Sequence, residues 1–338
     1  MDRSDSHEIH CEPSTSLNVY AIDAVALTEN HEKRWGKIQR TNPHYSSPFL
    51  TPGYTKLVAS CCEGVRVGVM ENADGRAVGF FPFQLIASRH AKPVGTIFCD
   101  YQAVIVEPEV QWKATELLSA CDLDRWDFDH LLADQQPFVP FHQVRDFSPV
   151  VDLSEGFEIY KARMKSEKRY QVSQAERRRR QMERELGEVT FSAHETNFEI
   201  LDRLLFIKRA QWSRSGWHHR FESPWERALM TGLVQTNDPD FGGMLTVLRV
   251  ENRPAAMHLG LRSQTVWHYW TTAYDTVFAR YSPGLVMLVE MIKSASSLGF
   301  KAIDLGKEDF LYKRRLMSYA VPLAEGTAWS QELSELKN

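Results

Sequence analysis

The same order of elements is predicted twice along this chain. Two apolar, strand-like runs flank the polar turn at residues 72–75, where Asp74-Gly75 favours a tight hairpin. A second pair of such runs flanks residues 251–254. A third strand-like run, a helix and a last strand then follow in each copy, at 96–106, 109–121 and 126–131 and again at 265–274, 282–298 and 301–305. This pattern predicts duplication of one α/β unit.

The spacing between the copies is nearly constant. Val67 and Val247 are 180 residues apart, and Trp126 and Ala302 are 176 apart. Helical runs are expected before each copy, at 27–39, 51–62, 157–186 and 198–213, and a further strand at 189–193. We place a boundary at 148–154. The prediction is two α/β units, 15–150 and 151–330, each with its own mixed sheet flanked by helices.

Composition is consistent with this division, since 338 residues suit two domains of about 150 residues. The net charge is −4, which argues against nucleic-acid binding by the whole chain. No apolar run reaches the roughly 20 residues of a membrane span, and residues 1–16 lack a signal-peptide pattern. The five cysteines form no C-x-x-C pair, and the adjacent His218 and His219 would point in different directions. We expect a cytoplasmic protein without disulfides or a metal.

The segment from Arg280 to Leu285 is the most informative for function. Ser282 is a good N-cap, and Pro283 suits the first helical position. Because a strand-like run precedes it, the helix N-terminus should present unpaired N–H groups beside Arg280, with Gly284 in its first turn. Such a site can bind a pyrophosphate; the alternative is that Ser-Pro-Gly only starts a helix.

Fingerprints of other enzyme classes are absent from the sequence. No G-x-G-x-x-G follows a strand, and neither G-x-x-x-x-G-K-[ST] nor G-x-S-x-G occurs. Dinucleotide oxidoreductases, P-loop NTPases and α/β-hydrolases therefore lack support.

The second copy resembles the BioF2-like, CelD/BcsL-type acetyltransferases of the GNAT superfamily. Their pattern is a YD dipeptide, an R-x-S-P-G-type helix start, a G-x-x-x-x-D strand and a G-D-E-x-Y-K-R-R-like tail. The chain has Tyr274-Asp275, Arg280-Tyr-Ser-Pro-Gly284, the segment 299–306 and Glu308-Asp-Phe-Leu-Tyr312-Lys-Arg-Arg315. It departs from the pattern at Gly306-Lys-Glu-Asp309. The basic segment 161–184 also looks like the family's, and the resemblance covers residues 160–319.

This resemblance implies a tandem GNAT fold, like that of the Fem-type peptidoglycan aminoacyl transferases. It implies that acetyl-CoA or another acyl-CoA places its pantetheine between the strands at 265–274 and 301–305, with the pyrophosphate at 280–285. The cofactor-binding residues expected on this basis are Tyr274, Arg280, Tyr281, Ser282, Gly284, Leu285 and Lys313.

Acyl transfer needs a group that takes a proton from the acceptor and one that protonates the leaving thiolate. His258 is the candidate base because histidine titrates near neutral pH; a histidine satisfied in the core is the alternative. Asp275 is either catalytic or the cap of its own turn. Tyr312 follows the last strand, where a thiolate is expected. His268 and Trp270 share one strand face, and the sequence leaves open whether that face is the site.

Charge is distributed unevenly along the chain. Residues 161–184 contain ten Lys and Arg and three Glu, a local charge of +7 that leaves −11 for the remainder. The segment is a solvated helix face, a surface that attracts an anionic substrate, or an RNA-binding surface.

The leading functional prediction is an acyltransferase that moves an acyl group from acyl-CoA to an amine or hydroxyl by direct attack, with the second unit catalytic. By family analogy the acceptor is a small molecule such as an amino sugar or an exopolysaccharide precursor. One alternative is a Fem-like aminoacyl transferase that uses charged tRNA. The other is a non-catalytic scaffold with the same fold.

Overall fold

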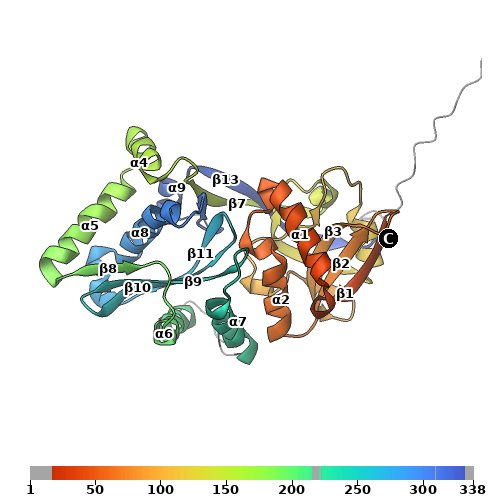
Figure 1. Ribbon diagram of the computed structural model, residues 1–338, viewed down its shortest axis with the longest axis horizontal. Coiled ribbons are helices and arrows are strands. Elements are labelled where there is room, and N and C mark those ends of the chain that lie inside the picture. The colour runs from red at the N-terminus through yellow and green to blue at the C-terminus, as the bar shows by residue number, and fades with distance from the viewer. Residues whose placement is uncertain (1–16, 215–220, 222, 309, 332–338) are drawn as a thin grey trace, which may run out of the picture.

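The computed structural model describes residues 17–214, 221, 223–308 and 310–331. We call residues 17–150 the first half and 151–331 the second half. Both halves are built of strands with helices between them in the sequence (Figure 1).

The first half carries the hairpin at the predicted position, and Gly75 adopts a φ of 72° in its turn. Its strands are β1 (Asn18–Asp23), β2 (Val65–Glu71), β3 (Ala77–Ala87), β4 (His90–Lys92), β5 (Ile105–Val106), β6 (Arg125–Leu132) and β7 (His142–Asp152). Its helices are α1 (Glu29–Thr41), α2 (Pro52–Cys61) and α3 (Ala114–Ala120).

The second half repeats the hairpin with β9 and β10. Its strands are β8 (Val189–Ser192), β9 (Gly242–Val250), β10 (Arg253–Arg262), β11 (Val266–Tyr274), β12 (Ala302–Asp304) and β13 (Tyr319–Trp329). Its helices are α4 (Phe157–Ser166), α5 (Gln171–Leu186), α6 (Phe198–Arg214), α7 (Pro224–Gln235), the short 3-10 helix η6 (Thr276–Tyr281), α8 (Pro283–Ser297) and α9 (Leu311–Leu316).

The second half has the predicted topology, and the first half has the same order of elements, with β4 in place of the strand predicted at 96–106. An antiparallel hairpin is followed by a strand, a helix and a strand that returns parallel: β4, α3 and β6 in the first half, and β11, α8 and β12 in the second. The prediction of two separate sheets is wrong, because the strands form one sheet in the order β1-β2-β3-β4-β6-β13-β7-β12-β11-β10-β9-β8.

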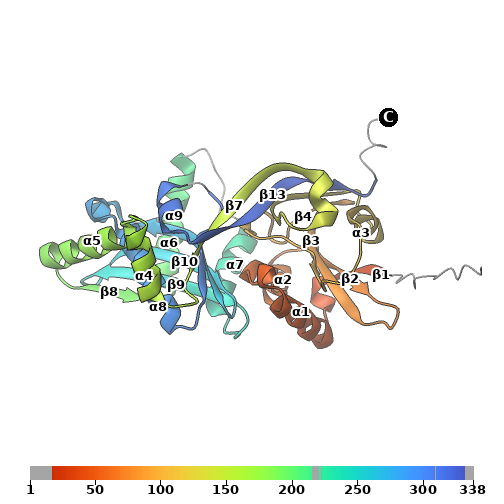
Figure 2. The same cartoon turned by 90° about the horizontal axis from the view of Figure 1, so that it is seen from above.

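The two halves exchange strands, and this exchange joins the sheets. β7 leaves the first half to pair with β12, and β13 returns from the second half to pair with β6. β7 and β13 also pair with each other, and they run together between the halves (Figure 2). The boundary predicted at 148–154 thus falls within and just after β7.

Two local predictions were wrong. Residues 96–106 were predicted as a strand, but after Gly95, whose φ is 74°, they form a short 3-10 helix, a buried loop and only the two residues of β5. The apolar run reflects burial of a loop between the halves. The helix predicted over 157–186 breaks between α4 and α5, where Lys168 has a φ of 57°.

Helices cover both faces of the sheet. One hydrophobic core lies under α1, α2, α6 and α7 and is shared by the halves, with Trp35 and Tyr54 from one and Leu204 and Leu229 from the other. A second core lies between the sheet and α4, α5 and α8, and a third lies under α3. In β11, Trp267 and Tyr269 belong to the core beneath α8, so the opposite face of that strand looks toward the first half.

Candidate active site

Strands β11 and β12 separate part-way along their length. They pair in parallel only from Val266 to His268, against Ala302 to Asp304. Beyond that point β11 continues to Tyr274 along β10. The segment that follows β12 instead turns away at Gly306, whose φ is 74°. A gap thus opens between the two strands. A Cβ at Gly306 would lie 3.5 Å from Nε2 of His268, so Gly306 keeps the base of this gap narrow.

The N-terminus of α8 follows the open end of β11 after the short helix η6. Ser282 is its N-cap with φ and ψ both 54°, and its hydroxyl makes no capping hydrogen bond, contrary to the predicted capping role, because this left-handed backbone turns it from the helix. A Cβ built at Gly284 would meet no atom within 4 Å, so open space lies before the first turn. Arg280 is 69% exposed, and its guanidinium lies 3.3 Å from Glu185.

Tyr274, Tyr281 and Leu285 complete the segment predicted to bind the cofactor. Tyr274 is 40% exposed at the end of β11, whereas Tyr281 is buried beneath the guanidinium of Arg280, 4.6 Å from its ring centroid. Leu285 is half-buried against the core below α8. The structure therefore brings the predicted residues 280–285 and Tyr274 to the two sides of one strand–helix junction.

Asp275 acts as the cap of its own turn. Its carboxylate accepts a hydrogen bond from the Val277 N–H at 3.1 Å and pairs with Arg203 at 2.9 Å. The alternative interpretation of this residue, a polar turn cap, is the one that the geometry supports.

His258 is a core residue. Its side chain is fully buried, its Nε2 accepts the Trp270 N–H at 3.1 Å, and its ring stacks on Tyr269 at 4.9 Å. Burial lowers its pKa from 6.5 to about 3. Because no face of the imidazole is exposed to a substrate, we withdraw the base role predicted for His258.

Lys313 and Tyr312 lie on α9, beside the gap. The Lys313 ammonium is buried and donates to the carbonyl oxygens of Gly306 at 3.1 Å and Lys307 at 3.0 Å, and burial lowers its pKa. Lys313 thus fixes the loop after β12 instead of reaching a phosphate as predicted. Burial raises the pKa of the Tyr312 phenol, which therefore stays protonated.

A polar network at the base of the gap was missed by the sequence reasoning. His268 Nε2 lies 3.0 Å from Asp100, and its Nδ1 lies 3.4 Å from Asp304. The Asp304 carboxylate also accepts from Tyr101 at 2.5 Å and from Ser148 at 2.6 Å. The side chains of His268 and Asp304 are 0% and 6% exposed, but Asp100 is 21% exposed. Among these three, the Asp100 side chain is therefore the most exposed.

Asp100 comes from the first half, although the gap belongs to the second. Burial opposes its ionisation, but the hydrogen bond from His268 and the nearby charges of His268, His130 and Lys313 hold its pKa below the usual 3.8. It is therefore a carboxylate at neutral pH. A charged residue inside an apolar run was the one signal in the sequence that pointed to it.

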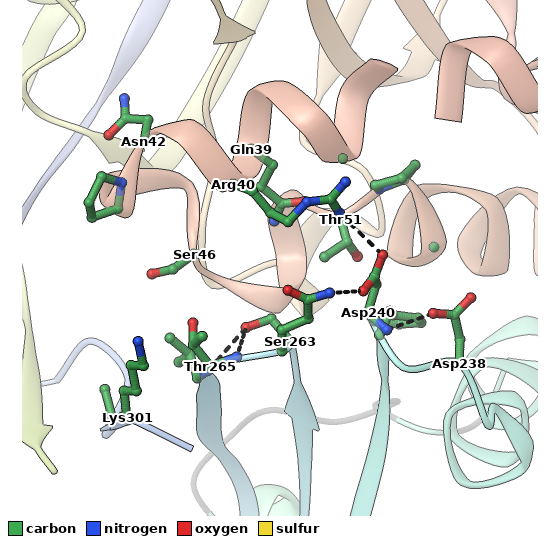
Figure 3. Close-up of a pocket in the computed structure, with 18 of the residues that line it drawn as sticks. Gln39, Arg40, Asn42, Ser46, Thr51, Asp238, Asp240, Ser263, Thr265 and Lys301 are labelled. Carbon is green, nitrogen blue, oxygen red and sulfur yellow. Dashed lines mark hydrogen bonds and ion pairs between the residues drawn. The ribbon is translucent and has the colours of Figure 1, made fainter. Parts of the chain in front are cut away.

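A cleft of about 780 Å³ lies between the halves (Figure 3). Most of the residues that line it are polar or charged: Arg40 faces Asp240 at 3.4 Å, with Asn42 on the side of the first half and Thr265 and Lys301 on the side of the second. A second pocket of about 380 Å³ shares part of this lining, including Val266 and Tyr319. This smaller pocket reaches Tyr101 and Asp304, so the cleft leads to the polar network.

Two further expectations concern metals and membranes. No group of three His, Cys, Asp or Glu side chains that could hold a metal is present in the part of the chain that the structure describes, and His218 and His219 lie outside it. Within the same residues, no helix is long and apolar enough to cross a bilayer.

Residues 167–314, which contain the gap and α8, match the family model described as acetyltransferase (GNAT) domain. This match covers less than half of the chain. None of the curated proteins matches the sequence.

Solved structures extend this likeness to the whole chain. FemX superposes with a TM-score of 0.59 at 11% identity, covering 92% of this chain and 98% of its own. The C-terminal domain of a putative lysylphosphatidylglycerol synthetase from Agrobacterium fabrum gives 0.55 at 12% identity, over 90% and 94% of the chains. A tandem GNAT protein from the clavulanic acid biosynthesis pathway gives 0.52 at 10% identity, over 94% and 99%. These likenesses show a tandem GNAT fold.

Proposed function

We propose that this protein is an acyltransferase of the CelD/BcsL type that transfers an acyl group from acyl-CoA to an amine or hydroxyl. The observation that carries the proposal is the gap between β11 and β12, which opens onto the free N-terminus of α8 within the GNAT acetyltransferase domain. A helix N-terminus with exposed N–H groups and an adjacent arginine binds phosphates.

The residues at this junction fit the donor. The open space before Gly284 leaves room for a phosphate against the backbone, and Arg280 is exposed beside it. Arg280, Ser282 and Gly284 would hold the pyrophosphate, with Tyr274, Tyr281 and Leu285 around them. When bound, acyl-CoA supplies an activated thioester.

The reaction needs one proton to be moved. The acceptor nitrogen or oxygen attacks the thioester carbonyl, a C–N or C–O bond forms, and the C–S bond breaks. Asp100 takes the acceptor proton, because it is the exposed carboxylate of the network, and His268 holds it in place. The thiolate takes up the proton that Asp100 releases through solvent, and the Tyr312 phenol would meet the thiolate only as a hydrogen-bond donor, so no further reactant is required.

The cleft is the proposed acceptor site. α8 packs on one face of β11 and β12, whereas the cleft and Asp304 lie on the opposite face, so donor and acceptor approach from different sides. A cleft of about 780 Å³ that combines polar side chains with apolar surface suits a hydroxylated acceptor such as an amino sugar or an exopolysaccharide precursor.

Mass spectrometry of reactions with acetyl-CoA and a panel of amino sugars and polysaccharide precursors tests the proposal. We expect a mass gain of one acetyl group on at least one acceptor, with release of an equal amount of CoA. Amino-acid transfer from charged tRNA, with no transfer from acetyl-CoA, would overturn it in favour of a Fem-like aminoacyl transferase.

A further inference from the structure

One strongly charged surface has no part in the proposed reaction. It is the arginine stripe, defined as Arg177, Arg180 and Arg184 on α5. At positions i, i+3 and i+7 they share one helix face, and all three are exposed. Within the described residues no carboxylate lies within ion-pair distance of Arg177 or Arg180, and Arg184 makes only a 3.4 Å contact with its neighbour Glu185.

The acidic side chains of the same helix have partners outside this stripe, although Glu185 also contacts Arg184; Glu183 pairs with Arg179 at 3.1 Å. Glu176 pairs with Lys161 at 2.6 Å and lies 3.8 Å from Lys293 of α8. Glu185 accepts a hydrogen bond from the Tyr281 hydroxyl at 2.8 Å. A helix face that is merely solvated mixes charges of both signs. Here Arg177 and Arg180 have no ion-pair partner among the residues that the structure describes, which favours a surface that meets an anionic partner.

The helix that carries the arginine stripe packs beside the proposed donor site. α5 packs against α8 and η6, and Arg178 donates to the carbonyl oxygen of Arg280 at 3.0 Å. Figure 1 shows α5 at the outer edge of the second half, away from the first half. A partner on this edge can thus reach the N-terminus of α8 without meeting the acceptor cleft.

Charge and size restrict what this partner can be. Arg177 and Arg184 are about 10 Å apart along the helix at 1.5 Å per residue, farther than one phosphate group of acyl-CoA can bridge. Outside residues 161–184 the chain carries −11, which repels an extended polyanion such as RNA but not a small acidic protein confined to the stripe.

We propose that the arginine stripe docks an acidic acyl-carrier protein, whose phosphopantetheine arm delivers the acyl group into the gap between β11 and β12. This inference rests on the proposed function, because a pantetheine thioester is the donor chemistry assumed there. A carrier protein is the acidic macromolecule that brings this chemistry, whereas tRNA carries no pantetheine.

Calorimetric titration of the full chain with an acidic holo-acyl-carrier protein tests the proposal. The stripe variant carries Arg177→Glu and Arg180→Glu. A matched control carries Lys37→Glu and Arg145→Glu, which make the same charge change at exposed sites of the first half. We expect the Kd for the carrier protein to rise about ten-fold or more in the stripe variant and to change less than about two-fold in the control. The Kd for acetyl-CoA should stay the same in both.

Three results would overturn the docking surface: no binding of the carrier protein, equal weakening by both variants, or loss of acetyl-CoA affinity in the stripe variant. Stripe-dependent binding of tRNA without binding of the carrier protein would assign the surface to RNA. If acetyl-CoA does not bind but the carrier protein binds through the stripe, the CoA donor is wrong and the docking surface stands.

Discussion

The two copies of the unit share a topology but differ at the helix that connects their parallel strands. In the second half, β11 has nine residues and α8 has fifteen, and the helix starts at Ser282-Pro283-Gly284 over open space. In the first half, β4 has three residues and α3 has seven, and the first turn of α3 contains the acidic Glu116. Because a carboxylate in the first turn repels an anion, only the helix start of the second copy fits the proposed phosphate site.

The gap of the first copy is also filled by the protein's own chain. Gln102 forms a parallel bridge with Leu131 beside β6, and its backbone N–H donates to the carbonyl of His130 at 3.0 Å. The same segment carries Asp100 and Tyr101 into the polar network of the second copy. We infer that the first copy has no donor site of its own and instead supplies a wall and a carboxylate to the other.

Separating the two copies should have the largest effect, because it should prevent the first copy from folding. In a polypeptide of residues 1–150, β6 would lack β13, and β7 would lose both of its neighbours, β12 and β13. We expect this fragment not to fold alone, as judged by circular dichroism and by NMR peak dispersion, and to gain structure on co-expression with 151–338. A well-dispersed spectrum of the isolated fragment would show that the copies are independent.

The second largest effect should come from Asp100, the carboxylate that the first copy contributes to the site of the second, and it should be an effect on kcat. Asp100→Asn keeps the side-chain shape but cannot take a proton, so kcat should fall about 100-fold or more while the Kd for acetyl-CoA changes less than about two-fold. Steady-state kinetics and calorimetry measure the two quantities. Asp124→Asn is the control, because Asp124 is an exposed carboxylate of the first half paired with Arg89 at 2.9 Å. Full activity of Asp100→Asn would remove Asp100 from the mechanism.

The smallest effect concerns His258, which contributes to stability and not to catalysis. Its pKa of about 3 in the folded protein is below the 6.5 expected when unfolded, so the unfolded state binds the extra proton as the pH falls below 6.5. Its stabilising contribution is present above that pH and declines by up to about 1.4 kcal/mol per unit of pH below it. In urea unfolding, the stability gap between wild type and His258→Gln should therefore narrow from pH 7.5 to pH 5. A gap independent of pH would contradict a buried neutral imidazole.

The sequence predicted the parts of this fold that depend on local patterns. The hairpin at Asp74-Gly75 follows from turn chemistry and the helix start at Ser282-Pro283 from the preference of proline for the first helical position, and both are where the sequence placed them. The strand exchange could not be read in this way, because the pairing of β13 with β6 joins residues 200 positions apart, such as Asp127 and Thr327.

In the candidate site, too, local features could be predicted and tertiary contacts could not. The segment 280–285 is local, and its position beside a strand end was predicted. The network of Asp100, His268 and Asp304 needs the tertiary contact between the copies, so no spacing in the sequence reveals it. His258 was chosen for its chemistry alone, and only the burial of its side chain shows that it belongs to the core.

We infer that each chain binds one acyl-CoA donor, at the N-terminus of α8 in the second copy. Gly284 and Thr115 are the second residues of α8 and α3, so a carboxylate at either one places the same charge at corresponding helix starts. In calorimetric titration with acetyl-CoA, we predict one site per chain, a Kd raised about ten-fold or more by Gly284→Asp, and no change from Thr115→Asp. Two sites per chain, or equal losses in the two variants, would contradict the account.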